Sequence, residues 1–159
     1  MSLRIAIAIA VSMLLAAMLA GCDGVVTGEK ASSEAVTETA NGSYGPVKLS
    51  LTPQMSPVAV NLRTEHGINA SDAGKWNTYL ATLRHNGREV AASKFNINYP
   101  GSVDGQPGAP YTLQNMLTAK IAEAGDYELT VVPVKPNDIK LINVRVEMRR
   151  NVEGNANLR

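Results

Sequence analysis

From residue 45 to residue 150 the chain consists of short runs in which apolar and polar residues alternate. Alternation with a period of two is typical of a β-strand that buries one face and exposes the other. The first two runs are separated by a turn that contains Pro53 and Pro57. Their apolar positions are Val47, Leu49 and Leu51, followed by Val58, Val60 and Leu62. The pattern predicts two strands joined by a proline-marked turn.

A two-residue hairpin turn is expected at Asn86-Gly87. Asn-Gly between two alternating runs is the strongest short hairpin signal, because both residues tolerate the positive φ angles of a type I′ turn. In this register Arg84 faces Glu89, which places opposite charges across the strands. Leu83 likewise faces Val90, so the expected register is consistent close to the turn.

Farther from this turn, the apolar residues of the two strands do not fall on the same face of the hairpin. Phe95 and Ile97 fall on the face opposite Leu83 if the pairing is regular. One extra residue in a strand restores the phase, because a shift by one position moves every side chain to the other face. A β-bulge or a local twist is therefore expected between Ala91 and Lys94.

Residues 112–124 fit two structures. A helix ending at Gly125 would place Met116, Leu117, Lys120 and Ile121 together, whereas a strand would align Leu117, Ala119 and Ile121. The surrounding strand pattern favours the strand. The next segment, Gly125 to Val131, is similar to the turn and strand of immunoglobulin-like sandwiches in which a tyrosine hydrogen-bonds back across the corner. Tyr127 is the candidate corner tyrosine.

About seven short strands separated by turn-rich segments predict an all-β fold. An antiparallel β-sandwich of the immunoglobulin-like kind is the first expectation, and a small jelly roll is the alternative. The last strand carries Ile142, Val144, Val146 and Met148 on one face. The expected domain covers residues 45–150, and a polar tail covers residues 151–159.

The amino end has the layout of a secretory signal peptide. A short start containing Arg4 precedes an apolar stretch, Ile5 to Met18, and a small-residue end at Leu19-Ala20-Gly21. As a helix, the stretch from Ile5 to Ala20 is about 24 Å long at about 1.5 Å per residue, short of the roughly 30 Å hydrocarbon core of a bilayer. Export followed by removal of residues 1–21 is therefore expected, rather than a permanent membrane span.

Leu19-Ala20-Gly21-Cys22 resembles the lipobox of bacterial lipoproteins at all four positions. The resemblance implies that a diacylglycerol is attached to the Cys22 thiol and that a peptidase cuts before Cys22; in that family the new amino group is often acylated as well. Cys22 is the chain's single cysteine, so no intramolecular disulfide competes for it. Asp23 resembles the signal that retains enterobacterial lipoproteins in the inner membrane. The expected location is the periplasmic face of a membrane, held by the lipid anchor, with the inner membrane favoured by Asp23 and the outer membrane as the alternative.

Residues 22–44 are expected to form the lipidated terminus and a flexible tether. The stretch after Cys22 is rich in Ser, Thr, Ala, Gly and Glu and has no apolar periodicity beyond Val25 and Val26. A short helix over Glu29 to Glu38 is the alternative, although isolated helices of that length are marginal in water.

Charge argues against a nucleic-acid partner. The chain has 15 Lys and Arg against 14 Asp and Glu, and removal of Arg4 with the signal peptide leaves 14 against 14. Nucleic-acid affinity comes largely from neutralising phosphates with clustered basic residues. Arg149 and Arg150 are too few for such a cluster and are interpreted as a solvated strand end.

No catalytic or metal-binding motif stands out in the sequence. Serine catalysis would need a histidine with an acidic partner and favours a strained turn of the Gly-x-Ser-x-Gly type, which does not occur. His66 and His85 have no metal-ligand spacing and are interpreted as surface residues. The covalent lipid on Cys22 is the only non-protein group expected, and no cofactor or metal is.

Four aromatic residues are candidates for a binding platform, because Trp and Tyr are enriched where proteins contact sugars and peptides. Core packing is the competing interpretation for each of them: Trp76, Tyr79, Tyr99 and Tyr111. The first functional hypothesis is a non-enzymatic binding or scaffolding module with an envelope protein as partner. A carbohydrate-binding domain for envelope glycans and a hydrolase with an unrecognised site are the alternatives.

Overall fold

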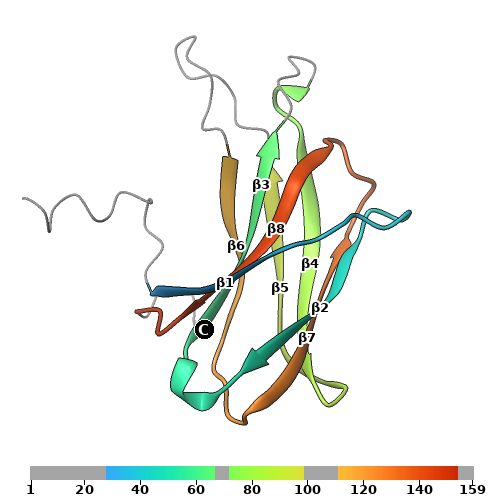
Figure 1. The fold of residues 1–159 in the computed structure, drawn as a ribbon. Coiled ribbons are helices and arrows are strands. Elements are labelled where there is room, and N and C mark those ends of the chain that lie inside the picture. The colour runs from blue at the N-terminus through green and yellow to red at the C-terminus, as the bar shows by residue number, and fades with distance from the viewer. Residues whose placement is uncertain (1–27, 67–71, 99–110, 154–159) are drawn as a thin grey trace, which may run out of the picture.

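A computed structural model describes residues 28–66, 72–98 and 111–153, and it contains eight strands and one short 3-10 helix, η1 (Pro53–Met55) (Figure 1). The strands are β1 (Glu29–Ala35), β2 (Tyr44–Leu51), β3 (Val58–His66), β4 (Trp76–His85), β5 (Arg88–Asn98), β6 (Tyr111–Ala119), β7 (Gly125–Pro133) and β8 (Leu141–Arg150). The segment from residue 112 is a strand, as its context favoured.

The strands form two antiparallel sheets, with the orders β1-β8-β3-β6 and β2-β7-β4-β5. This confirms the antiparallel β-sandwich. The order is that of a jelly roll, in which a long ribbon pairs the first strand with the eighth, the second with the seventh, the third with the sixth and the fourth with the fifth. An immunoglobulin-type sandwich instead keeps its first two strands together in one sheet. Alternation along a strand identifies its buried face but not its neighbours, so the sequence left both orders open.

The core is built from the inward positions of both sheets. The apolar faces predicted for the first two runs are buried, including Leu49, Leu51, Val58 and Leu62. In β8 the inward residue near the strand start is Leu141, and Ile142 is exposed, because Asn143 adopts a positive φ and shifts the strand's phase. The prediction that Ile142 points inward is therefore wrong.

The hairpin between β4 and β5 has the predicted two-residue turn, with positive φ at both Asn86 and Gly87. Arg84 faces Glu89, as expected, but Leu83 faces Ala91. Val90 is the extra residue, so the bulge is real but lies one step closer to the turn than predicted. The displaced Val90 side chain is exposed, since a bulged residue has no partner across the ladder.

Tyr127 forms the predicted tyrosine corner at the start of β7. Its hydroxyl donates a hydrogen bond to the carbonyl oxygen of Glu123 at 2.8 Å. The ring of the same residue is buried and stacks on His85, with the centroids 4.3 Å apart. His85 is thus a partly buried residue at the surface, with its side chain 13% exposed and its Nδ1 3.0 Å from the carbonyl oxygen of Asp126.

The segment predicted to be a flexible tether is folded from residue 29 onward. β1 pairs antiparallel with β8, and Glu38 forms a further bridge with Tyr44. β1 lies at a sheet edge with its side chains largely exposed, so it needs no apolar periodicity and gave no strand signal. At the other end, Val152 is buried and its amide donates to the carbonyl of Pro57, so the expected polar tail also begins later than Asn151.

Side chains of β8 hold β1 in place. Arg145 donates from Nε to the Ser33 hydroxyl at 3.0 Å and from Nη2 to the Ser33 carbonyl at 2.7 Å. The buried carboxylate of Glu147 accepts from Lys30 Nζ and Arg149 Nε, each at 3.1 Å. Charge pairing and hydrogen bonding thus replace apolar contacts as the attachment of this edge strand.

Replacing Arg149 by methionine is expected to lower the free energy of unfolding by about 3 kcal/mol, because breaking a buried ion pair leaves a carboxylate without one of its partners. The Arg149 side chain is 13% exposed and that of Glu147 is 5% exposed. Arg150 is the matched control, because it lies next in the chain and binds Glu29 in an exposed pair. Urea unfolding should show no measurable change for Arg150→Met, and equal losses in the two variants would contradict the buried pairing.

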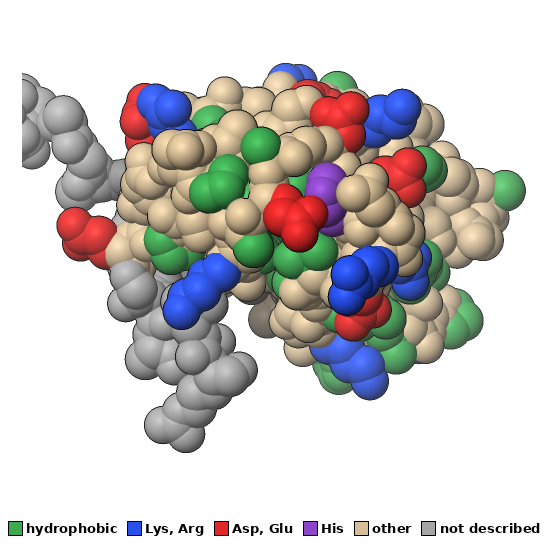
Figure 2. Space-filling view, turned by 90° about the horizontal axis from the view of Figure 1, so that it is seen from below, with side chains coloured by type: hydrophobic (Ala, Val, Ile, Leu, Met, Phe, Trp, Pro, Cys, Tyr) green, Lys and Arg blue, Asp and Glu red, His purple; other side chains and the backbone are tan. Residues whose placement is uncertain are grey.

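The end of the sandwich that carries the β4–β5 hairpin is seen in Figure 2. Basic and acidic side chains intermingle on the face in view, without a large area of one sign. This distribution agrees with the near balance of charges in the sequence.

Candidate functional site

The four aromatic candidates do not come together as one platform. Trp76 is 47% exposed at the first position of β4, whereas Tyr79 is fully buried in the same strand. Tyr111 begins β6 in the other sheet, where the Arg63 guanidinium lies 4.3 Å from its ring centroid. Tyr99 lies outside the described residues, as does Cys22. Trp76 is therefore the candidate aromatic residue that the structure leaves most open to a ligand.

Trp76 is surrounded by polar groups that a ligand could contact. The Lys135 ammonium lies 4.7 Å from the centroid of the indole, in cation–π geometry, and also pairs with the Asp138 carboxylate. Two positions along β4, the Thr78 hydroxyl donates to the side-chain oxygen of Asn96 on β5 at 2.9 Å. An exposed indole thus lies beside an ammonium, a carboxylate, a hydroxyl and an amide.

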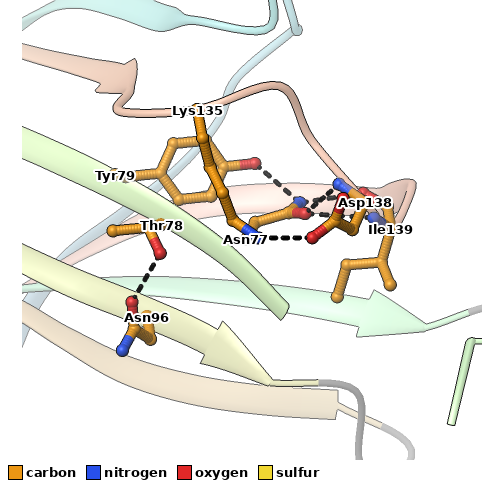
Figure 3. Close-up of polar contacts among 7 residues, drawn as sticks. All are labelled: Asn77, Thr78, Tyr79, Asn96, Lys135, Asp138 and Ile139. Atoms are coloured by element: carbon orange, nitrogen blue, oxygen red, sulfur yellow. Dashed lines mark hydrogen bonds and ion pairs between the residues drawn. The ribbon is translucent and has the colours of Figure 1, made fainter. Parts of the chain in front are cut away.

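Asn77, the neighbour of Trp76 in β4, forms hydrogen bonds with the connection between β7 and β8 (Figure 3). Its side chain is fully buried, and its oxygen accepts from the backbone amides of Asp138 and Ile139 at 2.8 and 3.0 Å. Its amide nitrogen donates to the carbonyl oxygen of Ile139 at 2.8 Å and to the Tyr79 hydroxyl at 3.0 Å. The β7–β8 connection, which carries Lys135, is thereby fixed to the strand that carries Trp76.

Tyr79 supports this arrangement from the core. Its ring stacks on Phe95 at 5.6 Å and meets Tyr44 edge-on at 6.1 Å. Burial raises the pKa of Tyr79, and it raises that of Tyr44 as well. Both hydroxyls are therefore neutral at physiological pH, which suits a buried structural role. Tyr79 is therefore a core residue, as the competing interpretation held, and it is not part of an aromatic platform.

Asn77 was not among the residues predicted from the sequence, although β4 contained a signal for it. Asn77 shares the inward phase of Tyr79, Ala81 and Leu83, so a regular strand places its amide in the core. A buried amide requires several hydrogen-bond partners. A polar residue at an inward strand position therefore indicates a fixed connection nearby.

The described part of the chain contains no group of three or more His, Cys, Asp or Glu side chains that could hold a metal ion. None of the helices in that part has the length and apolar character needed to cross a membrane.

Comparison with known proteins gives no match. No family model matches the chain, and no curated protein or solved structure is significantly similar to it.

Proposed function

We propose that the chain is a lipid-anchored envelope protein whose β-sandwich is a non-enzymatic binding module at the periplasmic face of a membrane. The observation that carries the anchor is the complete lipobox that ends at Cys22, with Asp23 favouring the inner membrane. Two or three acyl chains give stable attachment, because each buried CH₂ contributes only about 0.8 kcal/mol.

The start of β1 limits how far such an anchor lets the domain move. Only residues 23–28 separate Cys22 from Glu29. The seven residue-to-residue steps from Cys22 to Glu29 span at most about 25 Å when fully extended, at about 3.3–3.6 Å per residue. A lipid on Cys22 therefore holds the sandwich close to the headgroups, and partners in the same membrane are within its reach.

The binding role of the module is supported by the exposed Trp76. Large aromatic side chains at binding surfaces contribute most when they are held rigidly, because little side-chain entropy is lost on binding. Asn77 and Lys135 provide that support here. An envelope protein that buries the indole is the first candidate partner.

An envelope glycan is the second candidate partner. The flat indole offers an apolar face to a sugar ring, and Thr78, Asn96 and Asp138 offer hydrogen-bonding groups beside it. The carbohydrate-binding hypothesis therefore predicts that the sugar binds at the surface around Trp76.

Trp76→Ala is expected to weaken binding at least tenfold, because an interface aromatic contributes roughly 2 kcal/mol or more. The measurements are affinity capture from solubilised envelope and co-sedimentation with isolated cell-wall glycans. Retention of a protein would assign the first candidate, and retention by glycans the second. Val90→Ala is the matched control, since Val90 is 40% exposed on a different part of the surface.

Two outcomes would count against this surface. Binding by a folded Trp76→Ala variant that equals binding by the parent would exclude the indole as a contact. The parent chain could instead retain neither a protein nor a glycan in repeated captures, which would overturn the binding-module proposal itself.

A further inference from the structure

The outward face of the sheet β2-β7-β4-β5 carries an apolar strip over its two inner strands. Trp76, Val132 and Val134 are 47%, 39% and 49% exposed. Leu80 on β4 is half-buried and faces Val132 on β7 in the strand register. The amide of Val134 donates to the carbonyl oxygen of Thr78 at 2.8 Å, which holds Val134 beside β4. The Trp76 surface is therefore one end of a larger apolar area.

A row of four charged residues crosses the same face, one on each strand. Lys48 on β2 faces Glu128 on β7. Glu128 also faces Arg84 on β4, and Arg84 faces Glu89 on β5. All four residues are exposed, and among the described residues no ion pair within 4 Å includes any of them. The charges in this row alternate in sign from edge to edge and are open to another molecule.

The apolar strip and the charge row lie at different levels along the strands. Between them Thr82 faces both Thr130 and Ala92, so this level is uncharged. At the level of Leu80 the charged residue is Lys94 on β5, an edge strand from which a long side chain reaches water. The face is thus apolar toward Trp76 and charged toward the β4–β5 hairpin.

This face is complementary to itself. A twofold axis that runs along the strands, between β4 and β7, places β2 opposite β5 of a second copy and β7 opposite its β4. Lys48 then lies opposite Glu89 of the second copy, and Arg84 lies opposite its Glu128. The axis keeps each residue at its own level, so the two apolar strips also meet. Every charge in the row therefore finds its opposite.

We propose that the outward face of the sheet β2-β7-β4-β5 binds a second copy of this chain, with the strands of both copies aligned. Sheets packed face to face keep their strand directions within about 30°. Four strands about 4.8 Å apart, each about nine residues long at about 3.3 Å per residue, cover roughly 600 Å² on each copy. The total of roughly 1,200 Å² is at the lower bound of stable interfaces, so the dimer depends on concentration.

The inference rests on the proposed binding role of the Trp76 surface and names its partner. The axis leaves both copies pointing in the same direction, so β1 begins at the same end of the sandwich in each. Two lipid anchors on Cys22 can then enter one membrane, where confinement raises the effective concentration of the copies. The sheet-to-sheet contact itself does not require the lipid.

Sedimentation equilibrium of the full chain in density-matched nonionic detergent tests the dimer, from low micromolar to near-millimolar concentration. The mass should rise from one chain to two, and the fluorescence of Trp76 should shift to shorter wavelength over the same range. Val132→Lys is expected to weaken the dimer at least tenfold, because it places an ammonium in the apolar strip. Ile142→Lys is the matched control, since Ile142 is also 39% exposed but lies on the other sheet.

Charge reversal tests the axis. Arg84→Glu places carboxylates opposite Glu128 of the second copy, and Glu128→Arg places guanidiniums opposite its Arg84. Each variant alone, folded by circular dichroism, is expected to self-associate at least tenfold more weakly than the parent. An equimolar mixture of the two should dimerise as the parent does, because all facing charges at these positions are then opposite.

Three results would overturn the proposal. They are a parent that stays monomeric throughout, a Val132→Lys variant that dimerises as the parent does, and a mixture that associates no better than the single variants. A monomeric parent whose Trp76→Ala variant still loses a captured protein or glycan would assign this face to another occupant and keep the binding module.

Discussion

Replacement of Asn77 by alanine is expected to lower the free energy of unfolding by about 4 kcal/mol, the sum of several lost hydrogen bonds in a buried site. The amide of Asn77 satisfies two backbone N–H groups, one carbonyl and the Tyr79 hydroxyl. Alanine would leave these groups in the core without their partner. Groups desolvated in this way cost about 1–3 kcal/mol each, less whatever water can recover.

Urea unfolding followed by circular dichroism measures this loss. Thr78→Ala is the matched control, because Thr78 is the next residue and its single side-chain hydrogen bond is exposed. The control should lose less than about 1 kcal/mol. If both variants lost the same amount, Asn77 would not be the residue that fixes the β7–β8 connection.

The same substitution should also affect the Trp76 surface. Lys135 lies on the connection that Asn77 holds, so its position over the indole depends on these buried hydrogen bonds. Trp76 is the only tryptophan in the chain, and its fluorescence therefore reports on this contact alone. A changed emission in folded Asn77→Ala is the expected sign that the connection has loosened.

Individual strands could be predicted from the sequence because their signals are local. The alternation in β2 and β3, the Asn86-Gly87 turn and the Tyr127 corner each depend on a few neighbouring residues. The order of the strands depends on pairing between distant segments, and no local pattern decides between an immunoglobulin-like and a jelly-roll order. β1 was missed for a related reason, since its partner β8 holds it through Arg145 and Glu147 rather than through an apolar face.

The candidate sites were predictable to different degrees. Trp76 could be selected because a lone tryptophan at a loop-to-strand junction is a reasonable contact residue. Tyr79 could not be separated from it without knowing which face of β4 points inward. The alternating charges on Lys48, Glu128 and Arg84 line up through the strand register, which no local pattern supplies.

The early start of β1 also changes what the proposed anchor implies. A long flexible tether would let the domain reach away from the bilayer, whereas the short stretch between a lipidated Cys22 and Glu29 would keep it near the surface. The lipid and the fold are then adjacent in the chain but independent of each other. Loss of the lipid should therefore leave the sandwich intact.

Incorporation of labelled palmitate into the full chain in bacteria tests the anchor most directly. Cys22→Ser should abolish the label, because the thioether to the diacylglycerol requires the thiol. Asp23→Ser is the matched control, which keeps Cys22 and should keep the label. Circular dichroism and urea unfolding of Cys22→Ser should match the parent. Label that persists in Cys22→Ser, or a parent chain that takes up none, would contradict the account.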